Sequence, residues 1–306
     1  MKRKQGVEMN RLEDKVAMVF GGGPNMGGTI AHFMAREGAK IVIADIVESA
    51  AAEAVDFLKS RDYAGTALQG DAAEEDDVKR MVADAVKTYG KVDIVVNMAG
   101  KIHWSPITEM ELEGWQTCLM SYPTAAMLTT KHAARAMIAN KTIGSIIHII
   151  STAAHFGEAS GGAYTAAKAA VLNLARSAAM DLAHDRIRVN TITPCGMEHM
   201  LWTKTSEEIT DPNFVPPKRR SFYSRDDYLK MIPLERLPRA SDLAWAAVFL
   251  ASDEAAFLTG VDIPVDGGLR HKYPIWRPGD YTGVNIRDYA QDVKITRYGE
   301  ENEKLL

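Results

Sequence analysis

The sequence predicts an α/β fold in which one doubly wound parallel sheet is flanked by helices on both faces. Short apolar runs alternate along the chain with longer segments of helical pattern. The first two runs, Val16–Phe20 and residues 40–44, are separated by a glycine-rich turn and the helix-like segment 29–38. Strands that alternate with helices form βαβ units with right-handed crossovers and parallel strands. We therefore expect a single domain built on one such sheet.

The first βαβ unit has the pattern of a dinucleotide site. Five glycines fall within residues 21–28, directly after the first apolar run, and Asp45 follows the second. Glycines let the backbone approach a pyrophosphate, the start of the next helix offers free N–H groups, and the acid accepts from ribose hydroxyls. The strict G-x-G-x-x-G pattern is absent, but the order of strand, glycine turn, helix, strand and acid predicts a nucleotide site.

The next elements continue the alternation up to a candidate catalytic segment. Residues 74–90 have the amphipathic pattern of a helix, and residues 92–96 have the pattern of the next strand. The apolar run 146–150 predicts a buried strand that ends just before Ser151. Ser151 is therefore expected at the carboxyl end of a strand, where open α/β sheets bind ligands.

A phenol and an ammonium follow Ser151 at a spacing that suits proton transfer. Tyr164 and Lys168 are four residues apart at the start of an alanine-rich run, residues 164–183, that favours helix. Side chains at this spacing share one face of a helix. A free phenol has a pKa of about 10, and a nearby cation lowers it. We therefore expect Lys168 to lower the pKa of Tyr164.

Taken in order, these motifs resemble the short-chain dehydrogenase/reductase family of the Tyr-x-x-x-Lys type. The resemblance runs from about Lys15 to Gly268. Besides the features above, its landmarks are Asp71, the Asn-Met-Ala-Gly turn at residues 97–100, Arg188-Val-Asn190, Pro194 and the segment 258–268. The resemblance implies a Rossmann-like single domain, NAD(P) bound across the strand ends, and hydride transfer at an alcohol or carbonyl carbon.

The resemblance also implies a role for each site residue. Tyr164 would exchange a proton with the substrate oxygen, Ser151 would hold that oxygen, and Lys168 would donate to the nicotinamide ribose. A carboxylate at Asp45 accepts from a free 2′-hydroxyl and repels a 2′-phosphate, so the expected cofactor is NAD. The cofactor-binding residues implied are Gly21, Asn25, Met26, Gly27, Asp45, Asp71, Ala72, Asn97, Ala99, Gly100, Tyr164, Lys168, Pro194 and Met197.

The chain departs from the family pattern at several positions. Phe20 stands where threonine is usual, and Asn25 replaces the second glycine of the turn, where asparagine tolerates positive φ better than most residues. Tyr122, followed by proline, stands where the family has a catalytic asparagine; it could offer a hydroxyl, or the proton relay could be rearranged. Cys195 replaces a glycine, and His199 replaces a common threonine.

Substrate identity is the least determined part of the sequence analysis. Aromatic residues near the predicted site fit a cyclic or aromatic secondary alcohol or its ketone, although each residue alone fits ordinary packing. The candidates are His103, Trp104, His155, Phe156, His199 and Trp202, and the basic run 218–220 could meet a carboxylate. Two alternatives stay open, namely an epimerase or lyase that oxidises its substrate transiently and a non-catalytic NAD-binding regulator.

Composition restricts the class of protein and its partners. The chain has 306 residues, 46% of them hydrophobic, and a net charge of -4, which gives no reason to expect a nucleic-acid partner. Its two cysteines, Cys118 and Cys195, form no framework and no metal-ligand pattern, so we expect a reducing, cytoplasmic location and no metal. Neither a membrane span nor a signal peptide is indicated.

The expected organisation has three parts. Residues 1–11 form a tail, residues 12–270 the catalytic domain with a lid at 197–238, and residues 271–306 an extension. Its aromatic and aliphatic content predicts that the extension is ordered up to Tyr298. The family usually pairs the helix predicted at 164–183 across a two-fold axis, and Val171, Leu172, Leu174 and Met180 offer apolar surface there, so we expect a homodimer or homotetramer.

Overall fold

The computed structural model describes residues 10–197 and 229–272 and contains one seven-stranded sheet. All neighbouring strands are parallel, in the order β3-β2-β1-β4-β5-β6-β7. The strands are β1 (Val16–Phe20), β2 (Lys40–Asp45), β3 (Gly65–Gln69), β4 (Ile94–Asn97), β5 (Ser145–Ile149), β6 (Arg188–Pro194) and β7 (Asp262–Val265). The predicted α/β class and the doubly wound parallel sheet are confirmed.

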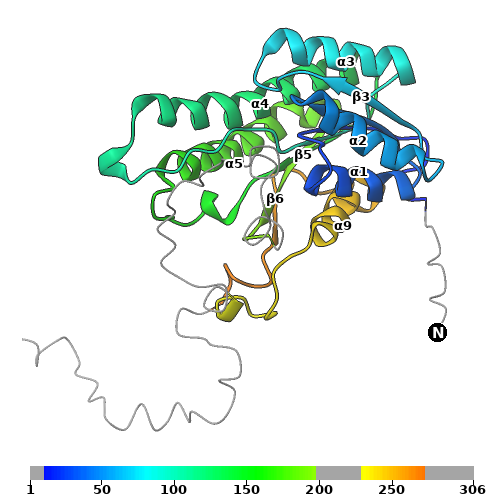
Figure 1. Ribbon diagram of the computed structural model, residues 1–306. Coiled ribbons are helices and arrows are strands. Elements are labelled where there is room, and N and C mark those ends of the chain that lie inside the picture. The colour runs from blue at the N-terminus through cyan, green and yellow to red at the C-terminus, as the bar shows by residue number, and fades with distance from the viewer. Residues whose placement is uncertain (1–9, 198–228, 273–306) are drawn as a thin grey trace, which may run out of the picture.

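Helices cover both faces of this sheet (Figure 1). On one face, α1 and α9 pack against each other and share a core with α2; on the other, α4 packs against α3 and α5. The helices are α1 (Met26–Arg36), α2 (Glu48–Lys59), α3 (Glu75–Tyr89), α4 (Leu112–Ala139), α5 (Gly162–Leu182) and α9 (Ala240–Ala251). This covering explains why β1 is apolar at every position instead of alternating, because each of its side chains meets a helix layer.

Helix ends follow local sequence signals. The helix predicted at 74–90 is α3, whose first turn carries Glu75, Asp76 and Asp77, favourable at the positive end of the helix dipole. It ends at Gly90, which takes the left-handed conformation with φ 83°. By contrast, α1 begins at Met26, which lies within the glycine-rich turn and three residues before the predicted start.

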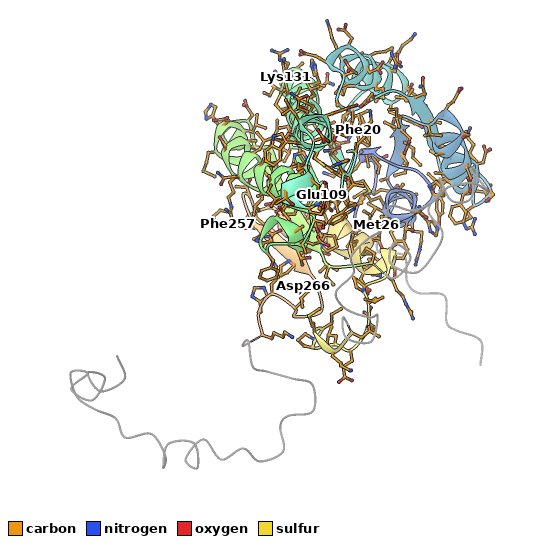
Figure 2. All side chains as sticks on the ribbon, turned by 60° about the vertical axis from the view of Figure 1, so that its left-hand side comes forward. Phe20, Met26, Glu109, Lys131, Phe257 and Asp266 are labelled. Carbon is orange, nitrogen blue, oxygen red and sulfur yellow. The ribbon has the colours of Figure 1, made fainter. Side chains whose placement is uncertain are left out.

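The order of the strands reverses between β1 and β4, which places a topological switch point at their carboxyl ends. In open α/β sheets, this is where ligands bind. A separate cavity of about 580 Å³, lined among others by Ile143, Arg188 and Phe257, contains none of the predicted site residues. Figure 2 shows Phe257 at the left-hand side, apart from Met26 at the start of α1. The candidate site is therefore built at the carboxyl edge.

Candidate active site

The glycine turn is shaped by glycines on either side of Asn25. Gly21 takes the left-handed conformation, with φ 76°, whereas Asn25 has φ -77°. The turn therefore forms with asparagine at this position without using its tolerance of positive φ. A Cβ at Gly27 would collide with the carbonyl oxygen of Gly21, so the first turn of α1 approaches the loop as only glycine allows. In the first turn of α1 the Gly28 N–H donates to the Gly23 carbonyl at 2.8 Å, and the N–H groups at a helix start are typical partners of a pyrophosphate.

Asp45 ties the glycine turn to the end of β2. Its Oδ2 accepts a hydrogen bond from the Gly23 N–H at 3.0 Å, and its Oδ1 accepts from the Val47 N–H at 3.0 Å. Each oxygen keeps a second lone pair for a ribose hydroxyl. The neighbouring residues Ile46 and Val47 are exposed and apolar, and residues 21–28 and 45–50 contain no lysine or arginine. These residues fit a free 2′-hydroxyl better than a 2′-phosphate.

The predicted adenine and ribose side combines one partly exposed carboxylate with a buried amide. Asp71 Oδ1 accepts from the Ala73 N–H at 2.8 Å, and Lys101 Nζ lies 3.3 Å from Asp71 Oδ2. Asn97 is buried, and its Oδ1 accepts from the Ala99 N–H at 3.2 Å. The Asn97 side chain therefore shapes the turn that contains Ala99 and Gly100, while Ala72 is buried in the core cluster against which Ala99 packs.

His148 on β5 extends this turn into the core, and the sequence analysis did not identify it. Its Nδ1 lies 3.5 Å from Asn97 Nδ2, and its Nε2 lies 3.0 Å from Thr130 Oγ1 on α4. Burial, together with the nearby charge of Lys168, lowers the pKa of His148 to about 4. A neutral imidazole therefore links two strands and a helix behind the site.

The predicted catalytic residues come together where β5 leads into α5. Ser151 follows β5, and its Oγ accepts from the Ala153 N–H at 3.2 Å, which caps the short helix Thr152–Ala154. Tyr164 lies in the first turn of α5, and a side-chain hydrogen bond with Ser151 acts to lower its pKa. Lys168, one turn later, is buried and donates from Nζ to the Ile149 carbonyl at 3.0 Å.

The electrostatics of this pair differ from the prediction. Burial raises the pKa of Tyr164 to about 12, and this outweighs the hydrogen bond with Ser151. Burial also lowers the pKa of Lys168 to about 7, so the charge that should act on the phenol is itself weakened. The Lys168 Nζ lies 5.7 Å from the centroid of the Tyr164 ring. Lowering of the Tyr164 pKa by Lys168, as predicted from spacing, is not found here.

Trp104 is the predicted substrate residue that contacts the phenol. Its ring centroid lies 5.6 Å from that of Tyr164 with the rings tilted by 43°. A parallel bridge between Ser105 and Gly161, with the Ser105 N–H donating to the Ser160 carbonyl at 2.8 Å, ties its segment to the start of α5. Gly161 itself packs closely against the indole. Trp104 therefore forms a wall beside Tyr164.

The other predicted substrate residues divide differently. The His103 ring packs against Gly114 on α4, and Phe156 is 48% exposed. His155 Nε2 lies 3.2 Å from Asp262 Oδ2 and 3.3 Å from Thr193 Oγ1, so it joins a polar network on β6 and β7. The side chain of His155 is 21% exposed, and its place in the substrate pocket stays a prediction. His199, Trp202 and the basic run 218–220 lie outside the described residues.

The predicted nicotinamide side is more deeply buried than expected. Thr193 Oγ1 donates to Asp262 Oδ1 at 2.6 Å, and Pro194 is buried at the end of β6. Met197 is buried and packs in the core shared with α1 and α9. Cys195 packs against Ile232, in the described part of the predicted lid.

In the described residues, 10–197 and 229–272, no group of three or more His, Cys, Asp or Glu side chains could hold a metal ion. No helix in the same ranges is long and apolar enough to cross a membrane.

Comparisons with known proteins agree with this architecture. A family model described as enoyl-(acyl carrier protein) reductase matches residues 24–270. An uncharacterized oxidoreductase of Thermotoga maritima is 36% identical over 262 residues, 85% of this chain and 98% of that protein. A 2,5-dichloro-2,5-cyclohexadiene-1,4-diol dehydrogenase of Sphingobium indicum is 35% identical over 263 residues, 85% of this chain and 97% of that protein.

A solved structure gives the same result for the fold. The short-chain type dehydrogenase/reductase of Mycobacterium marinum superposes with a TM-score of 0.74 at 26% identity, covering 88% of this chain and all of that one. The chain belongs to the short-chain dehydrogenase/reductase family. It is an oxidoreductase of the alcohol dehydrogenase or ketoreductase type.

Proposed function

We propose that the protein is an NAD-dependent dehydrogenase that oxidises a cyclic or aromatic secondary alcohol, or reduces the corresponding ketone. One observation carries this proposal. A phenol that is hydrogen-bonded to a serine hydroxyl lies beside an indole wall, at the edge of the sheet that also carries the glycine turn. Proton exchange and nucleotide binding can therefore take place on one face of the molecule.

Each of the three catalytic residues has a separate task. Tyr164 exchanges a proton with the substrate oxygen as general acid or base, and Ser151 hydrogen-bonds that oxygen. Lys168, held by the Ile149 carbonyl, directs its ammonium toward the ribose hydroxyls of the cofactor. When bound, NAD accepts the hydride and brings a positive nicotinamide charge, which favours the phenolate that burial alone disfavours.

The preference for NAD over NADP rests on Asp45. Both of its oxygens are fixed by backbone N–H groups, so the charge stays at the end of β2. A 2′-phosphate placed there would meet this carboxylate without a compensating cation from residues 21–28 or 45–50. Tight backbone approach at Gly27 supports a pyrophosphate at the start of α1.

A cyclic substrate is supported by Trp104 and by the relatives. An indole face beside the reacting phenol offers a flat apolar surface that suits a ring better than a flexible chain. The Sphingobium relative is named for a dichlorinated cyclohexadiene diol, which is a cyclic secondary alcohol.

We also propose a cytoplasmic homodimer or homotetramer. Exposed apolar side chains lie on α4 and α5, with Met120 63%, Met127 40% and Met180 65% exposed. Val171 and Leu172, which the sequence analysis placed at the interface, are instead buried within their own chain, where they pack between α4 and α5.

The proposed domain boundaries, 12–270 with an extension to 306, stay a prediction because residues 273–306 lie outside the described part.

The test is a substrate panel read at the absorbance of the reduced nicotinamide. The full-length protein is mixed with NAD or NADP and with cyclic, aromatic and linear secondary alcohols. We expect reduction of NAD with the cyclic alcohols and much less with NADP. Binding of NAD without reduction of any panel member would favour the regulator, and isomerisation without net reduction would favour the epimerase.

A further inference from the structure

Tyr122 on α4 touches both residues that the proposed chemistry uses. It is 8% exposed, and Lys168 Nζ lies 4.1 Å from the centroid of its ring. Its ring also meets the Tyr164 ring edge to face, with centroids 5.5 Å apart at 69°. On a third side, the ring packs against Gly100, where a Cβ would collide with it. The ring is therefore clamped between the cofactor-side turn and the catalytic pair.

The hydroxyl of Tyr122 has no comparable set of contacts. Among the residues that the structure describes, no group forms a hydrogen bond with it. Burial raises the pKa of this phenol above its ordinary value of 10. The side chain therefore stays neutral at working pH and acts on its neighbours through its ring.

The ring face meets an ammonium that has little other stabilisation. Lys168 donates to the Ile149 carbonyl, and within the described part of the chain no carboxylate forms an ion pair with it. The titratable groups around Lys168 and the two tyrosines are His148 on β5, Cys118 on α4 and Glu158 before α5. His148 is neutral, because burial lowers its pKa to about 4, and the pKa of the Cys118 thiol is raised by burial.

We propose that Tyr122 is a positioning residue whose ring face holds the Lys168 ammonium and whose ring fixes the phenol of Tyr164, without any role for its own hydroxyl. The electron-rich face of the ring attracts the ammonium and opposes the burial that drives Lys168 toward its neutral form. This proposal rests on the proposed function, because it gives Lys168 its task. In this arrangement, Tyr122 interacts with Lys168 through a cation–π contact instead of a hydrogen bond.

The first experiment needs no nucleotide. Full-length protein carrying ¹³C-labelled lysine is studied by NMR, and Lys168→Met assigns the Lys168 signal. Protons over an aromatic face are shifted upfield, so the methylene next to Nζ should have an upfield signal. That shift should persist in Tyr122→Phe and vanish in Tyr122→Leu. Persistence in Tyr122→Leu would overturn the contact whether or not the protein reduces NAD.

The second experiment separates the ring from the hydroxyl by kinetics. Tyr122→Phe should keep kcat and the KM for NAD within about twofold, whereas Tyr122→Leu should lower kcat/KM about 30-fold, the size of a desolvated cation–π contact. Equal losses in both variants would overturn the proposal in favour of a hydroxyl relay. If Tyr122→Leu fails to fold, as judged by circular dichroism, Tyr122→Met takes its place.

A pH profile excludes a merely structural role. Activity that needs charged Lys168 is lost as pH rises through the pKa of this residue, which burial lowers to about 7. Without the ring, the ammonium is less stable, so the alkaline limb of the kcat/KM profile should move to lower pH in Tyr122→Leu. It should stay in place in Tyr122→Phe. An alkaline limb at the same pH in all three proteins would show that Tyr122 only fills space.

Discussion

The nucleotide half of the domain (β1 to β3 with the glycine turn at residues 21–28) and the catalytic half (β4 to β7 with α4 and α5) each contain a residue that departs from the family pattern. The structural consequences of the two departures differ. In the nucleotide half, Asn25 has a negative φ of -77° with ψ -121°, and its side chain makes no capping hydrogen bond. In the catalytic half, Tyr122 contacts Lys168, Tyr164 and Gly100. A departure on an exposed loop is absorbed, whereas one in a packed core changes the surroundings of the reacting groups.

This difference follows from packing density. Asn25 is exposed, so its side chain can point to solvent while Gly21 and Gly27 meet the demands of the turn. Tyr122 belongs to the cluster in which α4 packs on α5, together with Cys118 and Ala167. Protein interiors are close-packed, so a large ring placed there must displace or contact whatever is adjacent. Substitution of buried Tyr122 should therefore have a far larger effect than substitution of exposed Asn25.

The largest effect is expected at Tyr164. Tyr164→Phe keeps the ring, and with it the packing against Tyr122 and Trp104, but removes the exchangeable proton. We expect kcat to fall at least about 100-fold, the contribution of a general acid–base group, while the Kd for NADH changes less than about twofold. Steady-state kinetics and NADH fluorescence measure both.

A matched control for that variant lies on α3. Tyr89 is hydrogen-bonded at 2.9 Å to Thr66 on β3, the edge strand that lies four places from β5 in the order of the sheet. Tyr89→Phe removes the same hydroxyl and should cost about 1 kcal/mol of stability with kcat unchanged. Turnover that survives in Tyr164→Phe would refute the acid–base role.

A smaller effect, about tenfold, is expected at Asp45. Asp45→Asn removes the charge that opposes a 2′-phosphate, so the ratio of kcat/KM for NAD over NADP should fall by about this factor. Glu48→Gln is the matched control, because this carboxylate lies three residues further along, exposed in the first turn of α2. An equal fall in the NAD-to-NADP ratio of kcat/KM in both variants would show a general charge effect rather than a specific effect of Asp45.

The fold was largely predictable because its signals are local. The run at β1 is apolar at every position, and the helix at α3 has acids at its start and a glycine at its end. Tyr164 and Lys168 were also predictable, because their relative placement depends only on the spacing of a helix. Such features need no knowledge of which segments pack together.

The surroundings of the site were not predictable, because they depend on contacts between distant segments. His148 lies in an apolar run, and its structural role comes from its contacts with Asn97 and Thr130 on other elements. The contact of His155 with Asp262 on β7 likewise joins two segments that are far apart in the sequence. The raised pKa of Tyr164 likewise results from burial by packed neighbours, which sequence spacing does not report.

The smallest effect is expected at Asn25, and it tests the comparison most directly. Its side chain is exposed and makes no capping bond, while its backbone carbonyl accepts from the Thr29 N–H at 3.0 Å, a contact that any residue can make. Asn25→Ala should therefore change the Kd for NADH less than about twofold and stability by less than about 0.5 kcal/mol.

Gly27→Ala, two residues further along, is the positive control for Asn25→Ala. Its added Cβ meets the Gly21 carbonyl oxygen and must push α1 away from the turn, so NADH affinity should fall sharply. Fluorescence titration measures the Kd for NADH of both variants, and a thermal melt of each compares their stability. If Asn25→Ala weakened NADH binding as much as Gly27→Ala, the exposed departure would matter as much as the buried one. The two halves would then respond alike, and packing density would not explain which departures affect function.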